Sequence, residues 1–294
     1  MAENPVLLAV LAHPDDESFG IGGTLALYAQ RQVQVHLVCA TRGEAGDVSS
    51  EHLEGFKSIA ERRVSELRCA AGILGLNGVY FLDYRDSGMT GSDDNRHPQA
   101  LVNAPLEEVA GKVVSFIRRL RPQVVITFDP IGGYMHPDHI AIHRATVKAF
   151  ELSGDPGYQD PQGLVPYRPE KLYYHVFPKL LIHAAVRIMP LIGRDPRKVG
   201  RNADIDLAAI AREGGFPTHA RIDFRRVRQQ RDEAAACHAS QLEGDLPRRG
   251  PLSWLLRLID HHEMYMRAFP PANGDLKERD LFEGLAESNR TKSA

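Results

Sequence analysis

The sequence predicts an α/β protein whose mostly parallel sheet is covered by helices on both faces. Short apolar runs of strand length, such as residues 6–12 and 124–128, alternate with longer stretches of helical periodicity through the first half of the chain. These runs are continuously apolar, which is typical of parallel strands that are buried on both faces. Strands and helices that alternate in this way indicate the α/β class.

Each expected element has a signal of its own. The expected strands are rich in Val, Ile and Leu, and two of the expected helices end at Gly75 and before Pro122. Strands are expected at residues 6–12, 33–41, 78–84, 124–128 and 171–177. Helices are expected at residues 22–32, 51–74, 106–120, 137–152, 223–242 and 252–267.

The pattern changes after residue 177, where basic residues, proline and glycine become frequent. We therefore expect a core over residues 1–177 and a mainly helical region over residues 178–294, which caps the edge of the sheet as part of the same domain. The apolar stretch 180–192 has basic flanks and is interrupted by Pro190. A buried cap helix is expected there rather than a membrane contact.

The composition is that of an ordinary globular protein, with 25% charged and 43% apolar residues. The 36 basic and 38 acidic residues give a net charge of −2, so no nucleic-acid partner is expected. The first apolar run is too short to span a membrane and is not preceded by the basic region of a signal peptide. We therefore expect a cytoplasmic protein without stable membrane association. The oligomeric state is open, a homo-oligomer included.

The three cysteines do not predict a disulfide framework. Cys39, Cys69 and Cys237 are odd in number, widely spaced and without a CxxC pair. Cys39 lies within an expected strand and is interpreted as a small buried apolar residue.

Two motifs that contain His-Pro-Asp follow expected strands. Residues 13–17 (HPDDE) come directly after the first strand, and residues 136–139 (HPDH) come shortly after the strand at 124–128. A single motif of this kind is more often a polar turn, because proline fixes φ and aspartate caps helices. Since ligands bind at the carboxyl ends of strands in open α/β sheets, two such motifs favour one joint site.

The motifs supply suitable ligands for a catalytic metal ion in the 1–177 core. A catalytic zinc site usually has three protein ligands, which are often imidazole nitrogens and carboxylate oxygens. His13 and Asp16 are three residues apart, so one turn can direct both to one point, and His139 can complete the set. Zn²⁺ is the expected ion, although the same ligands accept Fe²⁺, Co²⁺ or Mn²⁺.

The other residues of the motifs suit hydrolysis of an amide or an ester. Asp15 cannot easily point the same way as Asp16, so we expect it to be the general base. His136 is expected to stabilise an oxyanion or to donate a proton, and Asp138 is expected to orient the ring of His136.

With these motifs the chain resembles the LmbE-like (PIG-L) superfamily of zinc-dependent N-deacetylases. Residues 12–17 match its AHPDDE motif and residues 136–139 match its HPDH motif completely. Further shared stretches resemble the mycothiol-pathway members, which are an N-acetylglucosaminyl-inositol deacetylase and a mycothiol S-conjugate amidase. These stretches are residues 41–44, 85–89, 129–130 with 132–134 and, more weakly, 236–241.

The resemblance implies a Rossmann-like, three-layer α/β/α fold, and it implies the metal ligands and the base already named. It also implies that Arg63, Asp86, Met89 and Tyr134 line the substrate pocket. Arg63 and Asp86 can hydrogen-bond to sugar hydroxyls, and Met89 can contact an acetyl methyl group. Tyr134 has a hydroxyl that could reach an oxyanion. The chain departs from the pattern at Ile131, where the thiol-pathway relatives tend to have a polar residue.

The expected function is removal of an N-acetyl group from an amino sugar by a zinc-dependent hydrolase, with release of acetate and a free amine. The expected substrate is an N-acetylglucosaminide such as a low-molecular-weight-thiol precursor, and an amidase that acts on thiol S-conjugates is the alternative. A Rossmann-like nucleotide-dependent oxidoreductase would need a GxGxxG fingerprint, and residues 20–23 (GIGG) lack its spacing. A non-catalytic carbohydrate-binding protein would not need a base such as Asp15.

Overall fold

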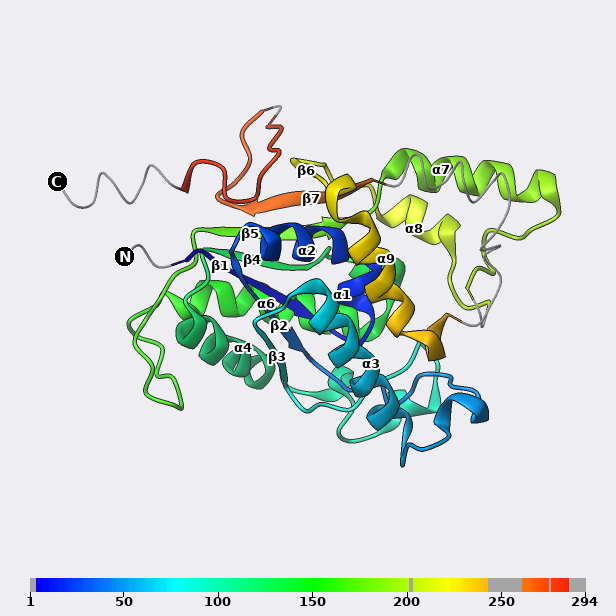
Figure 1. Cartoon of the computed structure of the whole chain (residues 1–294), viewed down its shortest axis with the longest axis horizontal. Helices are drawn as coiled ribbons and strands as arrows, with labels where there is room; N and C mark the ends of the chain where they lie inside the picture. The colour runs from blue at the N-terminus through cyan, green and yellow to red at the C-terminus, as the bar shows by residue number, and fades with distance from the viewer. Residues whose placement is uncertain (1–3, 201–202, 243–260, 275, 286–294) are drawn as a thin grey trace.

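The computed structural model describes residues 4–200, 203–242, 261–274 and 276–285. Within these residues the fold is built on one seven-stranded sheet with the order β3-β2-β1-β4-β5-β7-β6 (Figure 1). The strands β1 to β5 pair in parallel, and β7 pairs antiparallel with both β5 and β6. The strands are β1 (Val6–Leu11), β2 (Gln34–Cys39), β3 (Gly78–Phe81), β4 (Val124–Phe128), β5 (Lys171–Val176), β6 (Ala220–Asp223) and β7 (His262–Phe269).

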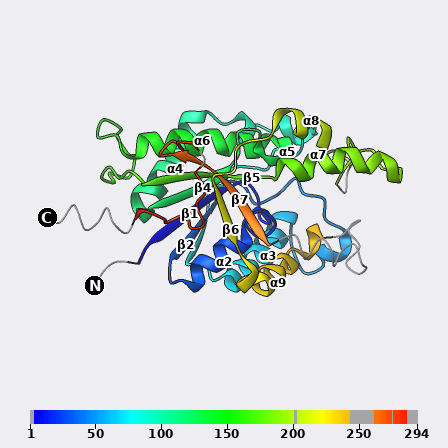
Figure 2. The ribbon, with the colours of Figure 1, turned by 90° about the horizontal axis from the view of Figure 1, so that it is seen from above.

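Helices cover both faces of the sheet. Figure 2 shows α2, α3 and α9 on one face and α4 and α6 on the other. The α-helices are α1 (Asp16–Phe19), α2 (Gly22–Gln30), α3 (Ile59–Leu74), α4 (Leu106–Leu120), α5 (Gly132–Met135), α6 (Pro137–Ser153), α7 (Lys179–Ile188), α8 (Leu207–Glu213) and α9 (Arg228–Cys237). The 3₁₀ helices are η1 (Ser50–Leu53), η2 (Asp93–Arg96), η3 (Leu101–Asn103), η4 (Met189–Ile192), η5 (Arg225–Val227) and η6 (Ala239–Gln241).

The expected elements of the first half are present, and the mostly parallel α/β sheet is confirmed. The central strands β1 and β4 are buried along nearly their whole length, as their continuous apolar runs predict. The predicted bounds of α4 and β4 agree with the structure. The helix α4 ends where expected because Arg121 takes a left-handed conformation and Pro122 follows it.

The long helix expected at residues 51–74 is shorter in the structure, because α3 begins only after Ser58. The Ser58 hydroxyl accepts the N–H of Glu61, and the Glu61 carboxylate accepts the N–H of Lys57. This arrangement resembles a capping box, which stabilises the first turn of a helix. Residues 50–53 form η1 instead, and Gly55 with a φ of 83° separates it from α3.

The C-terminal region differs most from its prediction. Residues 262–267 were expected within a helix, but they lie in β7, which pairs with β5 and β6 and extends the sheet. The described part of residues 178–294 therefore contains two strands, β6 and β7, in addition to the helices α7, α8 and α9. Residues 252–260, the beginning of the expected helix, lie outside the described residues. The helix expected at 223–242 is shortened to α9, with η5 before it and η6 after it.

The stretch 180–192 forms α7 and η4, but it is not the buried cap helix that was expected. Leu180 and Leu191 are 81% and 84% exposed, and Ile192 is 65% exposed. Among the described residues, no helix has both the length and the apolar character needed to cross a membrane.

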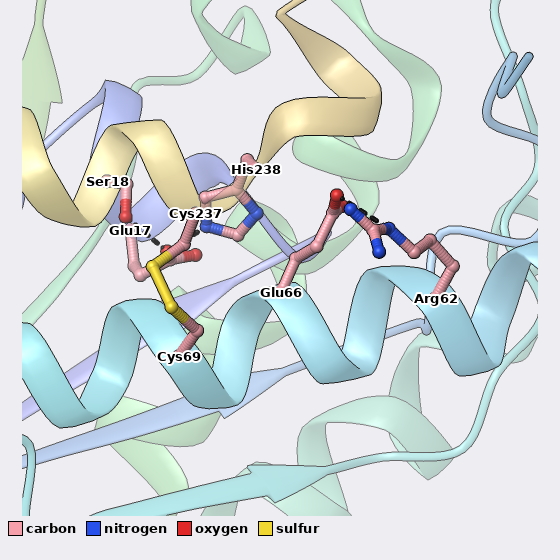
Figure 3. Close-up of a disulfide and its surroundings, with 7 residues drawn as sticks. All are labelled: Glu17, Ser18, Arg62, Glu66, Cys69, Cys237 and His238. Carbon is pink, nitrogen blue, oxygen red and sulfur yellow. Dashed lines mark hydrogen bonds and ion pairs between the residues drawn. A yellow bond between two sulfur atoms is a disulfide. The ribbon is translucent and has the colours of Figure 1, made fainter. Parts of the chain in front are cut away.

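The structure contains a disulfide between Cys69 on α3 and Cys237 on α9, contrary to the expectation from cysteine spacing (Figure 3). The two cysteines are 168 residues apart in sequence, but their helices pack side by side on one face of the sheet. Their Cα atoms are 5.9 Å apart, which is an ordinary separation for a disulfide. Cys39 is a free buried cysteine in β2, as predicted.

Candidate active site

The two His-Pro-Asp motifs meet at the carboxyl ends of β1 and β4. In the sheet, β2 and β3 follow β1 on one side of this pair, and β5 follows β4 on the other side. The chain therefore leaves β1 and β4 in opposite directions, and open α/β sheets bind their ligands at such a point. His13 and His139 are both buried at this position.

The first motif turns sharply at Asp15. Its φ of 124° lies in the left-handed region that favours glycine, and a non-glycine residue held in such a conformation costs about 1–3 kcal/mol. The Glu17 carboxylate accepts the N–H of Asp15 at 3.0 Å. The turn separates two neighbouring carboxylates, because Asp15 contacts Arg63 and Asp16 contacts His139.

The second motif starts a helix. Pro137 is the first residue of α6, where a missing N–H leaves no hydrogen bond unmade. His136 caps the helix, because its Nδ1 accepts the N–H of Asp138 at 3.1 Å. The preceding short helix α5 approaches α6 closely at Gly132, where an added Cβ would lie 2.7 Å from the Cβ of His139. Only glycine fits that position.

Three groups of the predicted ligand set converge on one point. His13 Nδ1 lies 3.2 Å from His139 Nε2, and the Asp16 carboxylate lies 3.6 Å from the former and 3.3 Å from the latter. The opposite ring nitrogens face acceptors: His13 Nε2 faces Asp138 and His139 Nδ1 faces the carbonyl of Gly132, both at 3.2 Å. If these nitrogens carry the protons, two imidazole lone pairs and a carboxylate face one another, which is a donor set that fits a cation.

Other groups around His13 could also hold a metal ion. His13, His136 and His139 offer nitrogens within 4.8 Å of one another, and so do His13, Asp86 and Asp138 with one nitrogen and two carboxylate oxygens. The site is therefore rich in metal-ligating side chains, and the predicted set of three is one of several that the geometry allows.

The partner expected for Asp138 is different in the structure. Its carboxylate contacts His13 Nε2 and accepts the N–H of Ser87, at 3.2 and 2.9 Å. The expectation that this carboxylate orients His136 is therefore wrong. The reason is local, because the N-cap bond to the main chain of Asp138 already holds the His136 ring. A carboxylate that orients a metal-ligating histidine through its second nitrogen is a common arrangement.

Asp15 has the properties of a general base. Its side chain is 18% exposed and lines the pocket described below. Burial raises the pKa of Asp15 to about 6, although the Arg63 guanidinium 2.9 Å away acts in the opposite direction. A carboxyl group that titrates near neutral pH can both accept and return a proton.

His136 is placed to donate a hydrogen bond from a neutral ring. Burial and the neighbouring rings of His13 and His139 lower the pKa of His136 to about 2. Because Nδ1 accepts the N–H of Asp138, the single proton of the neutral ring belongs on Nε2. In this tautomer the ring can donate a hydrogen bond from Nε2 without carrying a positive charge.

The four expected substrate-binding residues line one pocket of about 470 Å³ together with His13, Asp15 and His136. Although burial acts against it, the nearby His13 holds the pKa of Asp86 well below its usual range, so this carboxylate is ionised. Burial raises the pKa of the Tyr134 hydroxyl, which therefore keeps its proton as a donor. The pocket is also lined by Phe19, Ala45, Gly46, Asp47, Gly88, Ser92, Asp204, Ile205 and Gln241.

Some of these lining residues were not predicted. Phe19 is an apolar side chain that is 46% exposed, and its position two residues after HPDDE was the available signal. Gln241 lies in the weakly similar stretch 236–241. Asp204 and Ile205 lie outside the motifs found in the sequence, and only the tertiary structure places them at the pocket.

The fold and the site define an α/β protein with a cluster of histidines and carboxylates that could hold a metal ion, at the carboxyl edge of a mostly parallel sheet. The chain belongs to the PIG-L family, described as GlcNAc-PI de-N-acetylase, whose model matches residues 8–150. It is 36% identical to a 1D-myo-inositol 2-acetamido-2-deoxy-α-D-glucopyranoside deacetylase from Streptomyces avermitilis. That alignment covers 95% of this chain and 97% of the relative.

Solved structures with the same fold have lower sequence identity. The N,N'-diacetylchitobiose deacetylase from Pyrococcus horikoshii has a TM-score of 0.62 at 20% identity, over 90% of this chain and 84% of that chain. The 4-carboxy-2-hydroxymuconate hydratase GalB from Pseudomonas putida has a TM-score of 0.57 at 19% identity, over 92% and 99% of the two chains. A hydratase among these structures shows that the fold alone does not determine the reaction.

Proposed function

We propose that this chain is a zinc-dependent hydrolase that removes the acetyl group from the nitrogen of an N-acetylglucosaminide. The names of its relatives and its family support this class of reaction. The observation that carries the proposal is the convergence of His13 Nδ1, His139 Nε2 and the Asp16 carboxylate, with Asp15 beside them in the pocket. Binding of a sugar would not require a carboxyl group that titrates near pH 6.

In this proposal His13, Asp16 and His139 hold the metal ion, and Asp138 orients His13. Imidazole and carboxylate ligands suit zinc, and they also accept Fe²⁺, Co²⁺ and Mn²⁺. When bound, such an ion polarises a carbonyl group and makes water a stronger nucleophile.

The residues of the chain then move one proton. Asp15 accepts a proton from the attacking water as the water oxygen bonds to the acetyl carbon. His136 Nε2–H donates to the carbonyl oxygen as it becomes negative. Asp15 returns the proton to the nitrogen as the carbon–nitrogen bond breaks, which leaves a free amine and acetic acid, and the acid loses its proton to water to give acetate.

The pocket suits a polar sugar. Asp86, Ser92, Asp204 and Gln241 offer hydrogen-bonding groups for hydroxyls, and Met89 offers an apolar contact for the acetyl methyl group. We infer that residues 204 and 205 close one wall of the pocket, which gives the region after residue 177 a part in binding. The proposed substrate within this class is an N-acetylglucosaminyl-inositol.

The test is a direct assay of both products. Protein loaded separately with Zn²⁺, Fe²⁺, Co²⁺ or Mn²⁺ is incubated with N-acetylglucosaminyl-inositol, with other N-acetylglucosaminides and with thiol S-conjugates, and acetate and free amine are quantified. Equal amounts of acetate and amine from an N-acetylglucosaminide are expected, and the loss of one proton-transfer group in Asp15→Asn should lower the rate about 10²–10⁴-fold with the metal retained. Amine release from thiol conjugates alone would favour the amidase, and an unchanged rate in Asp15→Asn would remove the base from the proposal.

A further inference from the structure

Glu17 and His238 form a buried pair directly behind the first motif. Glu17 Oε1 lies 2.7 Å from His238 Nε2, although the two residues are 221 positions apart in sequence. Both side chains are 0% exposed, and neither lines the pocket. Burial of a carboxylate and an imidazole is costly unless their polar atoms are well bonded, so the pair requires a specific explanation.

The Glu17 carboxylate is bonded on both oxygens. Oε1 accepts the hydroxyl of Ser18 at 2.5 Å as well as facing His238, and Oε2 accepts the N–H of Asp15 at 3.0 Å. The side chain of Glu17 therefore folds back onto the main chain of its own motif. Its direct effect falls on the peptide group that carries the proposed base.

Asp15 is the residue of this motif that most needs support. Its main chain has the unfavourable φ of 124°, which only surrounding contacts can maintain. Glu17 holds the N–H of this residue, and Arg63 holds its carboxylate at 2.9 Å. Together the two contacts fix the direction in which the Asp15 carboxylate points.

The chain on both sides of His238 is bound to α3. The preceding residue, Cys237, forms the disulfide to Cys69, and Ser240 donates its N–H and its hydroxyl to Glu66 at 2.9 and 2.7 Å. Figure 3 shows the disulfide of Cys69 and the side chain of Glu66 on the side of α3 that faces His238. Since α3 also carries Arg63, one helix anchors both supports of Asp15.

The two ring nitrogens of His238 differ in their contacts. Nδ1 is buried and has no hydrogen-bond partner among the described residues. A histidine that only filled space would leave this group unsatisfied at a cost that an apolar residue would avoid. The contact of Nε2 with Glu17 is therefore the polar interaction that accounts for a histidine here.

We infer that Glu17 and His238 are positioning residues for Asp15, and that His238 acts through Glu17 to hold the main chain of the base in its productive direction. The inference rests on the proposed function, in which Asp15 transfers the proton. The proposed effect is on the position of the Asp15 carboxylate, because a small misplacement of a reacting group is enough to lower a rate substantially.

The test compares His238→Ala with His238→Gln and with the exposed control His183→Ala. In His238→Ala we expect kcat to fall about 10–100-fold, as is typical when a supporting contact is lost, with KM and metal content unchanged. His238→Gln should restore most of kcat, because its amide can donate to Glu17 from nearly the same place. His183→Ala should match wild type. A higher KM with an unchanged kcat, or loss of the metal, would overturn the inference.

The double variant His238→Ala with Asp15→Asn separates this inference from the proposed function. If His238 acts through Asp15, adding His238→Ala to Asp15→Asn should cause no further loss of rate. A further loss equal to that of the single variant would contradict the inference. Full activity in Asp15→Asn alone would instead contradict the proposed function.

A crystal structure of metal-loaded His238→Ala provides a readout without turnover. The Asp15 main chain should leave its left-handed conformation, or its carboxylate should move away from Arg63, and an unchanged Asp15 would contradict the inference. Should His238→Ala not fold, His238→Asn replaces it in every comparison. Its shorter amide should not reach Glu17, so it should be slow while His238→Gln is active, and equal rates in both would overturn the inference.

Discussion

The guanidinium of Arg63 binds both the carboxylate of Asp15 and main-chain carbonyl groups around it. Its Nη2 donates to the Asp15 carboxylate at 2.9 Å and to the carbonyl of Pro14 at 2.6 Å. Nη1 also donates to the carbonyl of Gly43 at 3.2 Å. A planar guanidinium can make these three bonds at once, whereas a single ammonium group cannot match their directions. Arg63 therefore positions the proposed base in addition to lining the pocket.

Arg63→Lys should lower kcat about 10–100-fold while the metal content stays unchanged, because the charge remains and the geometry is lost. Steady-state kinetics and metal analysis measure both quantities. Arg68→Lys, an exposed substitution on the same helix, is the matched control and should have wild-type activity. If Arg63→Lys had wild-type kcat, the charge alone would be sufficient.

Gly43 is the point at which a single methyl group should disturb the same contact. An added Cβ would lie 2.2 Å from Arg63 Nη1, and the φ of 73° already disfavours alanine. Gly43→Ala should therefore displace the guanidinium and lower kcat. Gly55→Ala is the matched control, because its φ of 83° carries a similar backbone cost of about 1–2 kcal/mol with nothing within 4 Å of the added atom. Equal kcat in the two alanine variants would exclude the proposed steric effect.

Elements with local signals could be predicted from the sequence. The bounds of α4 and β4 depend on an apolar pattern and on Pro122, which act within a few residues. The strand β7 forms because it pairs with β5 and β6, which are distant from it in sequence. Its own residues follow an apolar stretch, and their pattern also suits a helix. The disulfide between Cys69 and Cys237 likewise depends on the packing of α3 against α9.

For the candidate site, the sequence predicted which residues gather at the ends of the strands. The two motifs meet because β1 and β4 are neighbours, and the residues expected to bind metal and substrate gather there; their roles remain predictions. The direction of each side chain could not be predicted. The contact of Asp138 with His13 depends on how His136 caps α6, and that of His238 with Glu17 depends on a helix far away in sequence.

The disulfide should contribute to the stability of the fold. Joining α3 to α9 restricts the unfolded chain, and disulfides typically contribute about 2–4 kcal/mol. We expect Cys237→Ala, or reduction of the wild type, to lower the free energy of unfolding by this amount in urea titrations. Reductant should not change the stability of Cys237→Ala further. Equal stability of oxidised and reduced wild type would contradict the prediction.

The stability of the protein should fall in acid partly because of His175 on β5. Burial lowers the pKa of His175 to about 4, from an ordinary value of 6.5, although Asp16 favours the protonated form. Above pH 6.5 the ring is neutral in both the folded and the unfolded chain and contributes nothing to the pH dependence. Between pH 6.5 and pH 4 only the unfolded chain binds the proton, so stability is lost as the pH falls, by up to about 3 kcal/mol.

His175→Gln removes this titration and should therefore flatten the dependence of the unfolding free energy on pH in that interval. Urea unfolding of wild type and variant, measured with a chelator present so that metal release does not contribute, gives the difference in slope. His183→Gln, which removes an exposed histidine from α7, should keep the wild-type slope. If His175→Gln lost stability between pH 6.5 and pH 4 as steeply as the wild type, another group would carry the acid sensitivity, and the buried His143 would be tested next because burial lowers its pKa as well.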